Sequence, residues 1–167
     1  TFAIQWARAI GAHVAVTAGS DEKLARCADL GAEVLINYRE QDFVSALPQP
    51  ADVILDVVGA KYLDRNVRAL ADGGRLVVIG LQGGVKAELN LGALLSKRGS
   101  VIATSLRSRP TAQKAEICEA VVRDVWPLYG TGAIRPVIDR VLPLADATEA
   151  HRLLADSSHF GKVLLAV

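Results

Sequence analysis

Short apolar runs alternate with helical patterns along most of this chain, and glycine or another small residue follows nearly every run. Strands that alternate with helices over short loops form βαβ units and a parallel sheet. The crossovers of such units are right-handed, so the predicted fold is α/β with a doubly wound parallel sheet. The expected strands cover residues 13–17, 34–36, 53–58, 75–80 and 101–105, with further strands at 137–142 and 162–167.

A dinucleotide-binding sheet of this kind opens with a strand and a G-x-G-x-x-G turn. Neither of these comes before the first helical pattern, which covers residues 1–10. In that pattern, Phe2, Trp6 and Ile10 recur at helical spacing and predict one buried face. We therefore expect a Rossmann-type doubly wound sheet that lacks its first strand and its glycine-rich turn in this chain. The sequence begins with Thr1 and contains no methionine, so we also expect the native start to be missing.

The strict alternation ends near Gly132, so residues 1–132 are predicted to form an incomplete dinucleotide-binding domain and residues 133–167 to belong to another structural unit. Thr111 is expected to begin a long helix that reaches about Tyr129. Asp146 and Glu149 have the spacing of a capping box at the start of the last helix.

Composition excludes several classes of function. The net charge is +1 with no basic cluster, which argues against nucleic-acid binding, and no apolar run approaches the roughly 20 residues of a membrane span. Cys27 and Cys118 are far apart and lie in helical patterns, as expected for thiols in a reducing, cytoplasmic compartment. No spacing of cysteine, histidine or acidic residues predicts a metal site.

Ligands of doubly wound sheets bind beyond the carboxyl ends of the strands. An acidic residue after the second strand of such a fold favours NAD, but the corresponding place here is Ala18 or Gly19. Ser20, at a helix N-terminus, and Lys23, one turn later, suit the 2′-phosphate of NADP instead. The alternative is that Ser20 is only a helix cap and Lys23 only a solvated surface residue.

Three further kinds of residue carry open alternatives. Tyr38, after the next strand, either contacts the adenosine half of a nucleotide or lies on the rim of the site. Asp56, at a strand end, is either an acid or base or the cap of a turn. The three histidines show no pairing with a nucleophile, so no catalytic residue is assigned.

The ordered set of motifs resembles the medium-chain dehydrogenase/reductase superfamily, and more narrowly its zinc-independent quinone oxidoreductase branch. No single motif is decisive, and the resemblance covers nearly the whole chain. The segments that carry it are residues 16–24, 30–32, 37–43, 54–59, 72–75, 80–84, 97–100, 105–109 and 161–165.

This resemblance implies that Ser20, Lys23 and Tyr38 hold NADP(H). It also implies that the nicotinamide side is lined by the loops that follow two later strands, with His159 standing where relatives have an asparagine. Residues 133–167 would return to the catalytic domain, most of which would precede Thr1. The predicted cofactor-binding residues are Ser20, Lys23, Tyr38, Gly59, Gly80, Leu81, Ser105, Leu106, Arg107 and His159.

The activity implied is hydride transfer from NADPH to a quinone or an α,β-unsaturated carbonyl, without zinc. Two alternatives are an enoyl reductase domain of a larger synthase and a non-catalytic NADPH-binding protein. The resemblance also implies a homodimer through the edge strand near Val101–Thr104. Because a central strand is missing, we expect residues 1–167 alone to fold poorly, to bind NADPH weakly and to be inactive.

Overall fold

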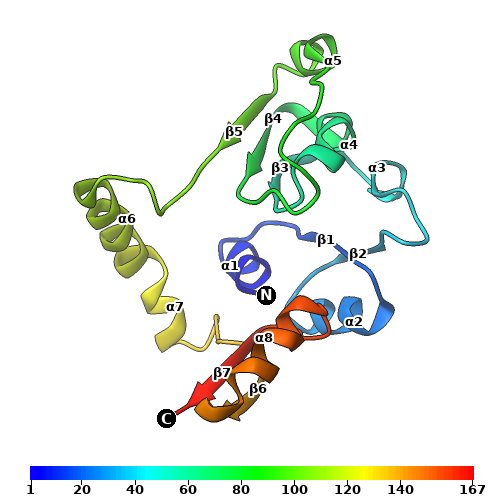
Figure 1. Ribbon diagram of the computed structural model, residues 1–167. Helices are drawn as coiled ribbons and strands as arrows, with labels where there is room; N and C mark the ends of the chain where they lie inside the picture. The colour runs from blue at the N-terminus through cyan, green and yellow to red at the C-terminus, as the bar shows by residue number, and fades with distance from the viewer. The chain divides into compact units, whose positions relative to one another are not determined.

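The computed structural model describes residues 1–167 as two compact units of parallel strands and helices (Figure 1). One unit contains residues 1–39 and 117–167, and the other contains residues 40–116. No helix combines the length and the apolarity needed to cross a membrane. The elements are α1 (Phe2–Ala9), β1 (Ala15–Ala18), α2 (Asp21–Asp29), β2 (Val34–Asn37), α3 (Phe43–Ala46), β3 (Ala51–Asp56), η1 (Ala60–Tyr62), α4 (Leu63–Ala69), β4 (Leu70–Val78), α5 (Leu91–Ser96), β5 (Ser100–Ala103), α6 (Thr111–Asp124), α7 (Trp126–Gly130), β6 (Ile138–Pro143), η2 (Leu144–Asp146), α8 (Ala147–Ala155) and β7 (Lys162–Ala166).

In the first unit, α2 connects the parallel strands β1 and β2. Ser20 caps α2, and Gly31 ends the turn that follows it with a φ of +106°, a conformation that favours glycine. Leu24 and Cys27 are buried on one face of α2. The core of this unit gathers five buried residues from both of its chain segments: Ile4, Val14, Cys27, Ala32 and Phe160.

The same unit contains a second parallel pair, β6 and β7, connected by α8. The predicted capping box at the start of α8 is wrong, because the Asp146 side chain makes no capping hydrogen bond. The Glu149 carboxylate instead accepts hydrogen bonds from the Arg152 guanidinium, at 2.7 and 2.8 Å. The Glu149 side chain is therefore paired with the exposed Arg152 and not with the backbone at the start of the helix.

The second unit is a three-stranded parallel sheet in the order β3–β4–β5, with α4 joining the first two strands (Figure 1). Val67 of α4 and Leu70 and Leu76 of β4 are almost fully buried and form its core. Strand β4 begins at Leu70, earlier than the expected start at residue 75, because Leu70 pairs with Ala51 before a shift in register.

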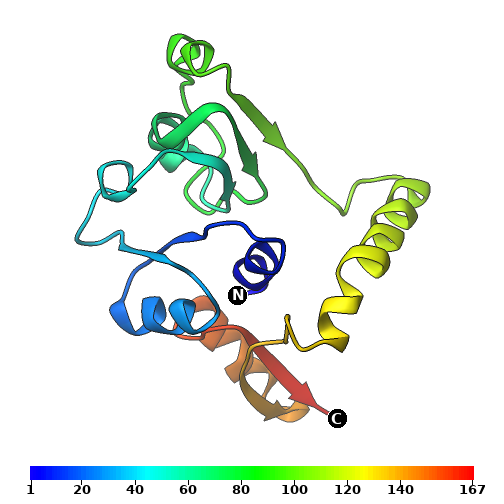
Figure 2. The ribbon, with the colours of Figure 1, turned by 180° about the vertical axis from the view of Figure 1, so that it is seen from behind.

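The long helix expected after Thr111 is interrupted at Val125, so that α6 and α7 are separate helices (Figure 2). Pro127 lies in the first turn of α7, where its missing amide hydrogen does no harm. A proline at this position ends the preceding helix, since its ring clashes with the carbonyl one turn earlier.

The predicted buried face of α1 is also wrong. Phe2, Trp6 and Ile10 are 43, 38 and 64 % exposed, whereas Ile4 and Gln5 are buried. The reason is a pair of hydrogen bonds made by Gln5, whose amide donates to the Arg135 carbonyl (3.0 Å) and accepts from the Arg135 amide (3.0 Å). This pairing turns the Gln5 side of α1 toward the segment that contains Arg135.

The fold class is otherwise as predicted. All pairings between strands are parallel, and helices connect successive strands. Strand β1 pairs only with β2, and β3 pairs only with β4, so each of these two strands has one edge without a partner.

Candidate functional site

The N-terminus of α2 is built around Ser20. This residue has extended backbone angles, and its hydroxyl accepts a hydrogen bond from the Lys23 amide at 3.4 Å. Asp21 and Glu22 occupy the first turn, where negative charge stabilises a helix. The Asp21 carboxylate accepts a hydrogen bond from the buried Asn37 amide (3.1 Å), which ties the start of α2 to the end of β2.

Tyr38 lies against the turn that precedes this helix. A Cβ atom placed on Gly19 would come within 2.6 Å of the Tyr38 hydroxyl and 3.1 Å of Arg39 Nε. The ends of two side chains from the end of β2 therefore lie close to the Gly19 backbone. The structure thus places Tyr38 beside the turn that contains Ser20.

Arg39 is a candidate that sequence reasoning missed. Its guanidinium stands beside Gly19, next to Tyr38, and it adds a fixed positive charge to the donors at this helix N-terminus. The available signal was its position two residues after a strand end, at the edge of the sheet where ligands bind.

Lys23 is half-buried, and its ammonium donates a hydrogen bond to the Ser157 carbonyl at 2.5 Å. Ser157 follows α8 and has a φ of +53°, the left-handed region that L-residues adopt at a cost. Predicted site residue His159 lies two residues further along, and its ring is 3.3 Å from the Leu153 carbonyl. Lys23 and His159 therefore belong to neighbouring segments of the same unit.

In the second unit, the structure brings Gly59, Gly80 and Leu81 together. Gly59 has a φ of +77°, and a Cβ placed on it would lie 2.9 Å from both the Gly84 carbonyl oxygen and the Leu81 side chain. A Cβ placed on Gly80 would lie 2.8 Å from the Val57 carbonyl oxygen. The loops after β3 and β4 are thus packed backbone to backbone.

Asp56 closes the loop after β3. Its side chain is buried, and its two oxygens accept hydrogen bonds from the Val58 amide (2.9 Å) and the Gly59 amide (2.8 Å). Of the two alternatives left open by the sequence, the structure supports the cap of a turn.

Ser105, Leu106 and Arg107 follow β5 and are exposed. The Arg107 carbonyl accepts a hydrogen bond from the Lys114 ammonium at 2.9 Å, which links this loop to α6. Because β3, β4 and β5 are parallel, these residues follow the same edge of the sheet as Gly59 and Gly80. No hydrogen bond connects residues 105–107 with Gly59 or Gly80.

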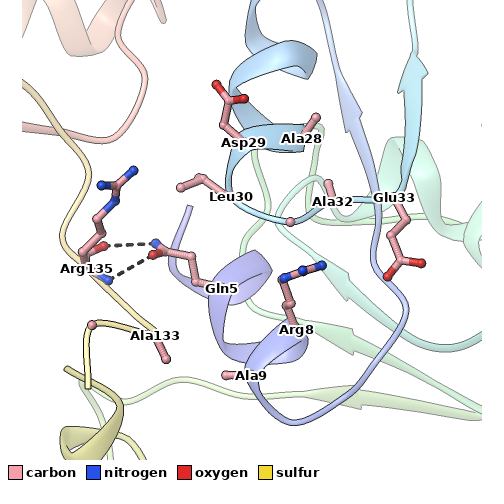
Figure 3. Close-up of a pocket in the computed structure, with 12 residues that line it drawn as sticks. Gln5, Arg8, Ala9, Ala28, Asp29, Leu30, Ala32, Glu33, Ala133 and Arg135 are labelled. Carbon is pink, nitrogen blue, oxygen red and sulfur yellow. Dashed lines mark hydrogen bonds between the residues drawn. The ribbon is translucent and has the colours of Figure 1, made fainter. Parts of the chain in front are cut away.

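A pocket of about 540 Å³ lies at the opposite end of α2 from Ser20 and contains none of the predicted site residues (Figure 3). Gln5 and Arg135 stand on one side of it, joined by their two hydrogen bonds, and Leu30 borders it from the end of α2. The pocket lies beyond the amino ends of β1 and β2, the edge of a parallel sheet that does not bind ligands.

No group of three histidine, cysteine or acidic side chains is placed to hold a metal ion. Cys27 is buried, and burial raises the pKa of its thiol. Cys118 is exposed on α6.

Comparison with known proteins places the chain in a family. Residues 30–165 match the family model described as "Zinc-binding dehydrogenase". Quinone oxidoreductase 1 of Escherichia coli is 32 % identical over 98 % of the chain and 52 % of its own length. A polyketide synthase subunit of Mycobacterium tuberculosis, for phenolphthiocerol and phthiocerol, is 29 % identical over 99 % of the chain but only 8 % of its own length.

Among solved structures, the quinone oxidoreductase of Thermus thermophilus, which was also solved in complex with NADPH, is 34 % identical with a TM-score of 0.83. The match covers 98 % of this chain and 53 % of that one. The chain thus spans about half the length of the quinone oxidoreductases it matches. On the match of its residues 30–165 and on its fold, the chain belongs to the zinc-binding dehydrogenase family, within the medium-chain dehydrogenase/reductase superfamily and its quinone oxidoreductase branch.

Proposed function

We propose that this chain is the nucleotide-binding portion of an NADPH-dependent oxidoreductase that transfers hydride to a quinone or an α,β-unsaturated carbonyl. The observation that carries the proposal is the group of hydrogen-bond donors at the start of α2. Ser20 caps the helix, Tyr38 and Arg39 approach the Gly19 backbone, and Lys23 follows one turn later.

This donor set fits a 2′-phosphate. Two cationic side chains, two hydroxyls and a helix N-terminus offer charge-assisted hydrogen bonds to a dianion. Tyr38 also approaches the Gly19 backbone at that turn, which keeps its hydroxyl close to the other donors. NADPH, when bound, supplies the hydride, and the protein holds and orients it.

Within that proposal, Ser20, Lys23 and Tyr38 bind the adenosine 2′-phosphate. The nicotinamide half is assigned to the loop residues Gly59, Gly80, Leu81, Ser105, Leu106 and Arg107, with His159 as a further contact. The boundary near residue 132 is proposed to separate the nucleotide-binding domain from a tail, 133–167, that returns to the catalytic domain. β6 and β7 pair only with each other, while Phe160 packs in the core formed with residues 1–39.

The test is cofactor discrimination in the complete protein. We expect NADPH to bind at least tenfold more tightly than NADH, and Lys23→Ala to remove most of that preference by weakening NADPH alone, since a charge-assisted contact contributes about 1.5–3 kcal/mol. Glu116→Ala, on exposed α6, is the control. Equal affinity for the two cofactors in the unmodified protein would refute the assignment.

A second candidate is an enoyl reductase domain of a larger synthase, which the resemblance to the mycobacterial synthase subunit supports. Rates of NADPH oxidation with a benzoquinone and with an enoyl thioester distinguish the two enzymes. If the protein binds NADPH tightly but turns over no acceptor, the result would favour a third candidate, a non-catalytic NADPH-binding protein.

We also propose a cytoplasmic homodimer that works without zinc. All four residues of β5 are exposed, and this strand pairs only with β4, so its outer edge can pair with that of a second copy. Light scattering on the complete protein should give the mass of a dimer. Val101→Pro should give a monomer, because the Thr104 amide bonds the Val78 carbonyl of β4, so the alternate amides of Val101 and Ala103 face the outer edge, and proline cannot donate to the pairing there. Metal analysis of the purified protein should find less than one zinc per chain.

A further inference from the structure

Lys23 has a partner inside the protein at the position where the proposed function needs it free. Its ammonium binds the Ser157 carbonyl, from a segment 134 residues away in the sequence. Asp156, the nearest acid in that segment, is engaged by the Arg152 guanidinium at 2.9 Å. Lys23 is therefore held by a neutral oxygen rather than by a carboxylate.

A carbonyl is a weaker acceptor for an ammonium than a phosphate dianion, because only the phosphate adds charge–charge attraction. The side chain of Lys23 is directed toward Ser157, whose carbonyl oxygen is its hydrogen-bond partner. A 2′-phosphate bound beside Ser20 would compete with this carbonyl for the ammonium.

The segment that would move if Lys23 left the Ser157 carbonyl is anchored at both ends. At its start, the Ser157 amide donates to the Leu154 carbonyl (3.2 Å) at the end of α8. At its end, the Phe160 amide donates to Asp139 (2.9 Å), and the Arg26 guanidinium lies 4.2 Å from the centre of the Phe160 ring. Movement is thus confined to the residues between Ser157 and Phe160.

Ser157 has the left-handed conformation that follows a helix end and is usually filled by glycine. A non-glycine residue holds this conformation against a cost, so the segment carries a bias toward rearrangement. The contact with Lys23 opposes that bias.

We propose that the Ser157 carbonyl competes with the 2′-phosphate of the cofactor for Lys23, so that NADPH releases residues 157–159 while NADH leaves them in place. This inference rests on the proposed NADPH site. In this proposal the Ser157 carbonyl, which does not contact the phosphate, affects cofactor specificity because it weakens NADPH binding. It also couples NADPH binding to the segment that contains His159.

The competition predicts opposite effects from two substitutions at one position. Ser157→Gly favours the left-handed conformation, so it should weaken binding of 2′,5′-ADP about three- to fivefold. Ser157→Val disfavours that conformation and should strengthen the same binding by a similar factor, since left-handed backbone costs roughly 1–2 kcal/mol for L-residues. Neither should change the binding of 5′-AMP, which lacks the 2′-phosphate.

Calorimetry on the complete protein measures these affinities, with Ser96→Gly, at an exposed serine of α5, as the matched control. In a Lys23→Gln background both Ser157 effects should vanish. Hydrogen exchange supplies a second measurement: amides of residues 157–159 should exchange faster with 2′,5′-ADP bound but not with 5′-AMP bound.

The outcomes separate the two proposals. If the unmodified protein binds 2′,5′-ADP no better than 5′-AMP, the NADPH site itself is wrong. If it prefers 2′,5′-ADP but both Ser157 variants bind it as the unmodified protein does, or if exchange in residues 157–159 is unchanged, the competition is refuted while the NADPH site stands.

Discussion

At the scale of single residues, the loops at the strand ends depend on glycine for two physical reasons. At Gly19, a Cβ would meet the Tyr38 hydroxyl at 2.6 Å, so a larger residue would displace the end of that side chain. Gly59 is required by its backbone, with a φ of +77° that favours glycine, and by the Gly84 carbonyl beside it. Both positions follow the end of a strand.

Gly59→Ala should lower the free energy of unfolding by about 1–3 kcal/mol, because the new Cβ meets strained backbone and a carbonyl oxygen at once. Chemical denaturation measures this. Gly92→Ala is the control, since a Cβ there has only one ordinary contact, with Asn90, and lies within α5. That change should raise stability by roughly 0.5–1 kcal/mol. An unchanged midpoint for Gly59→Ala would contradict the packing of this loop.

His13 and Glu33 form an exposed ion pair (2.7 Å) at the starts of β1 and β2. The hydrogen bond to Glu33 raises the pKa of His13 above 6.5, and the same bond lowers the pKa of Glu33 below 4.5. The histidine contribution is present below pH 6.5 and is lost as pH rises through the raised value. The glutamate contribution is present above pH 4.5 and is lost as pH falls through the lowered value. The pair is therefore most effective between about pH 4.5 and 6.5.

An NMR titration tests this pair directly. Glu33→Gln should shift the midpoint of His13 toward lower pH, since the carboxylate that stabilises the imidazolium is gone. Glu22→Gln removes the same charge from α2 and should leave the midpoint where it is. If the midpoint of His13 does not move in Glu33→Gln, the ion pair does not form in solution.

At the scale of elements, α2 bears on two alternatives that the sequence left open: Ser20 and Lys23 either bind a phosphate or are only a helix cap and a surface residue. Ser20 is a cap, as the bond from the Lys23 amide shows. The same helix also places Lys23 against the segment after α8 and Arg26 over the Phe160 ring. Its other side is buried through Leu24 and Cys27.

Ser20→Asp separates capping from phosphate binding. Aspartate is as good a cap as serine, so thermal stability should stay within about 0.5 kcal/mol of the unmodified protein. A carboxylate at that point repels a 2′-phosphate, so NADPH affinity should fall about tenfold or more while NADH affinity is kept. Ser20→Ala should instead lose about 1 kcal/mol of stability. Retained NADPH affinity in Ser20→Asp would mean that Ser20 is a cap alone.

At the scale of the whole molecule, the strands form three small parallel sheets, two of two strands and one of three. Two-stranded sheets are at best marginally stable without further cover. Alternate residues of β3 are half exposed although apolar, with Val53 and Leu55 both at 51 %. Doubly wound sheets are normally covered on both faces.

For residues 1–167 expressed alone we expect a broad, weakly cooperative thermal transition and NADPH binding at least tenfold weaker than in the complete protein. Each exposed apolar side chain and each unpaired strand edge withholds stabilisation that a covered sheet would have. Calorimetry of both proteins makes the comparison. A sharp transition with micromolar NADPH affinity for the 167 residues would show that they fold independently.

The sequence by itself determined the α/β class, the order of the elements and the parallel pairing, because these depend on local periodicity and on short connections. It also predicted the cap at Ser20 and the end of α2 at Gly31.

The tertiary structure alone decided which face of α1 is buried, because Gln5 finds its partner at Arg135, 130 residues away. It decided that Asp56 closes a turn and that Arg39 stands beside Gly19. It also decided that Lys23 meets Ser157, a contact that no local pattern contains. Side-chain hydrogen bonds between residues far apart in the sequence depend on how distant segments pack. Local periodicity and helix or strand propensity therefore do not predict them.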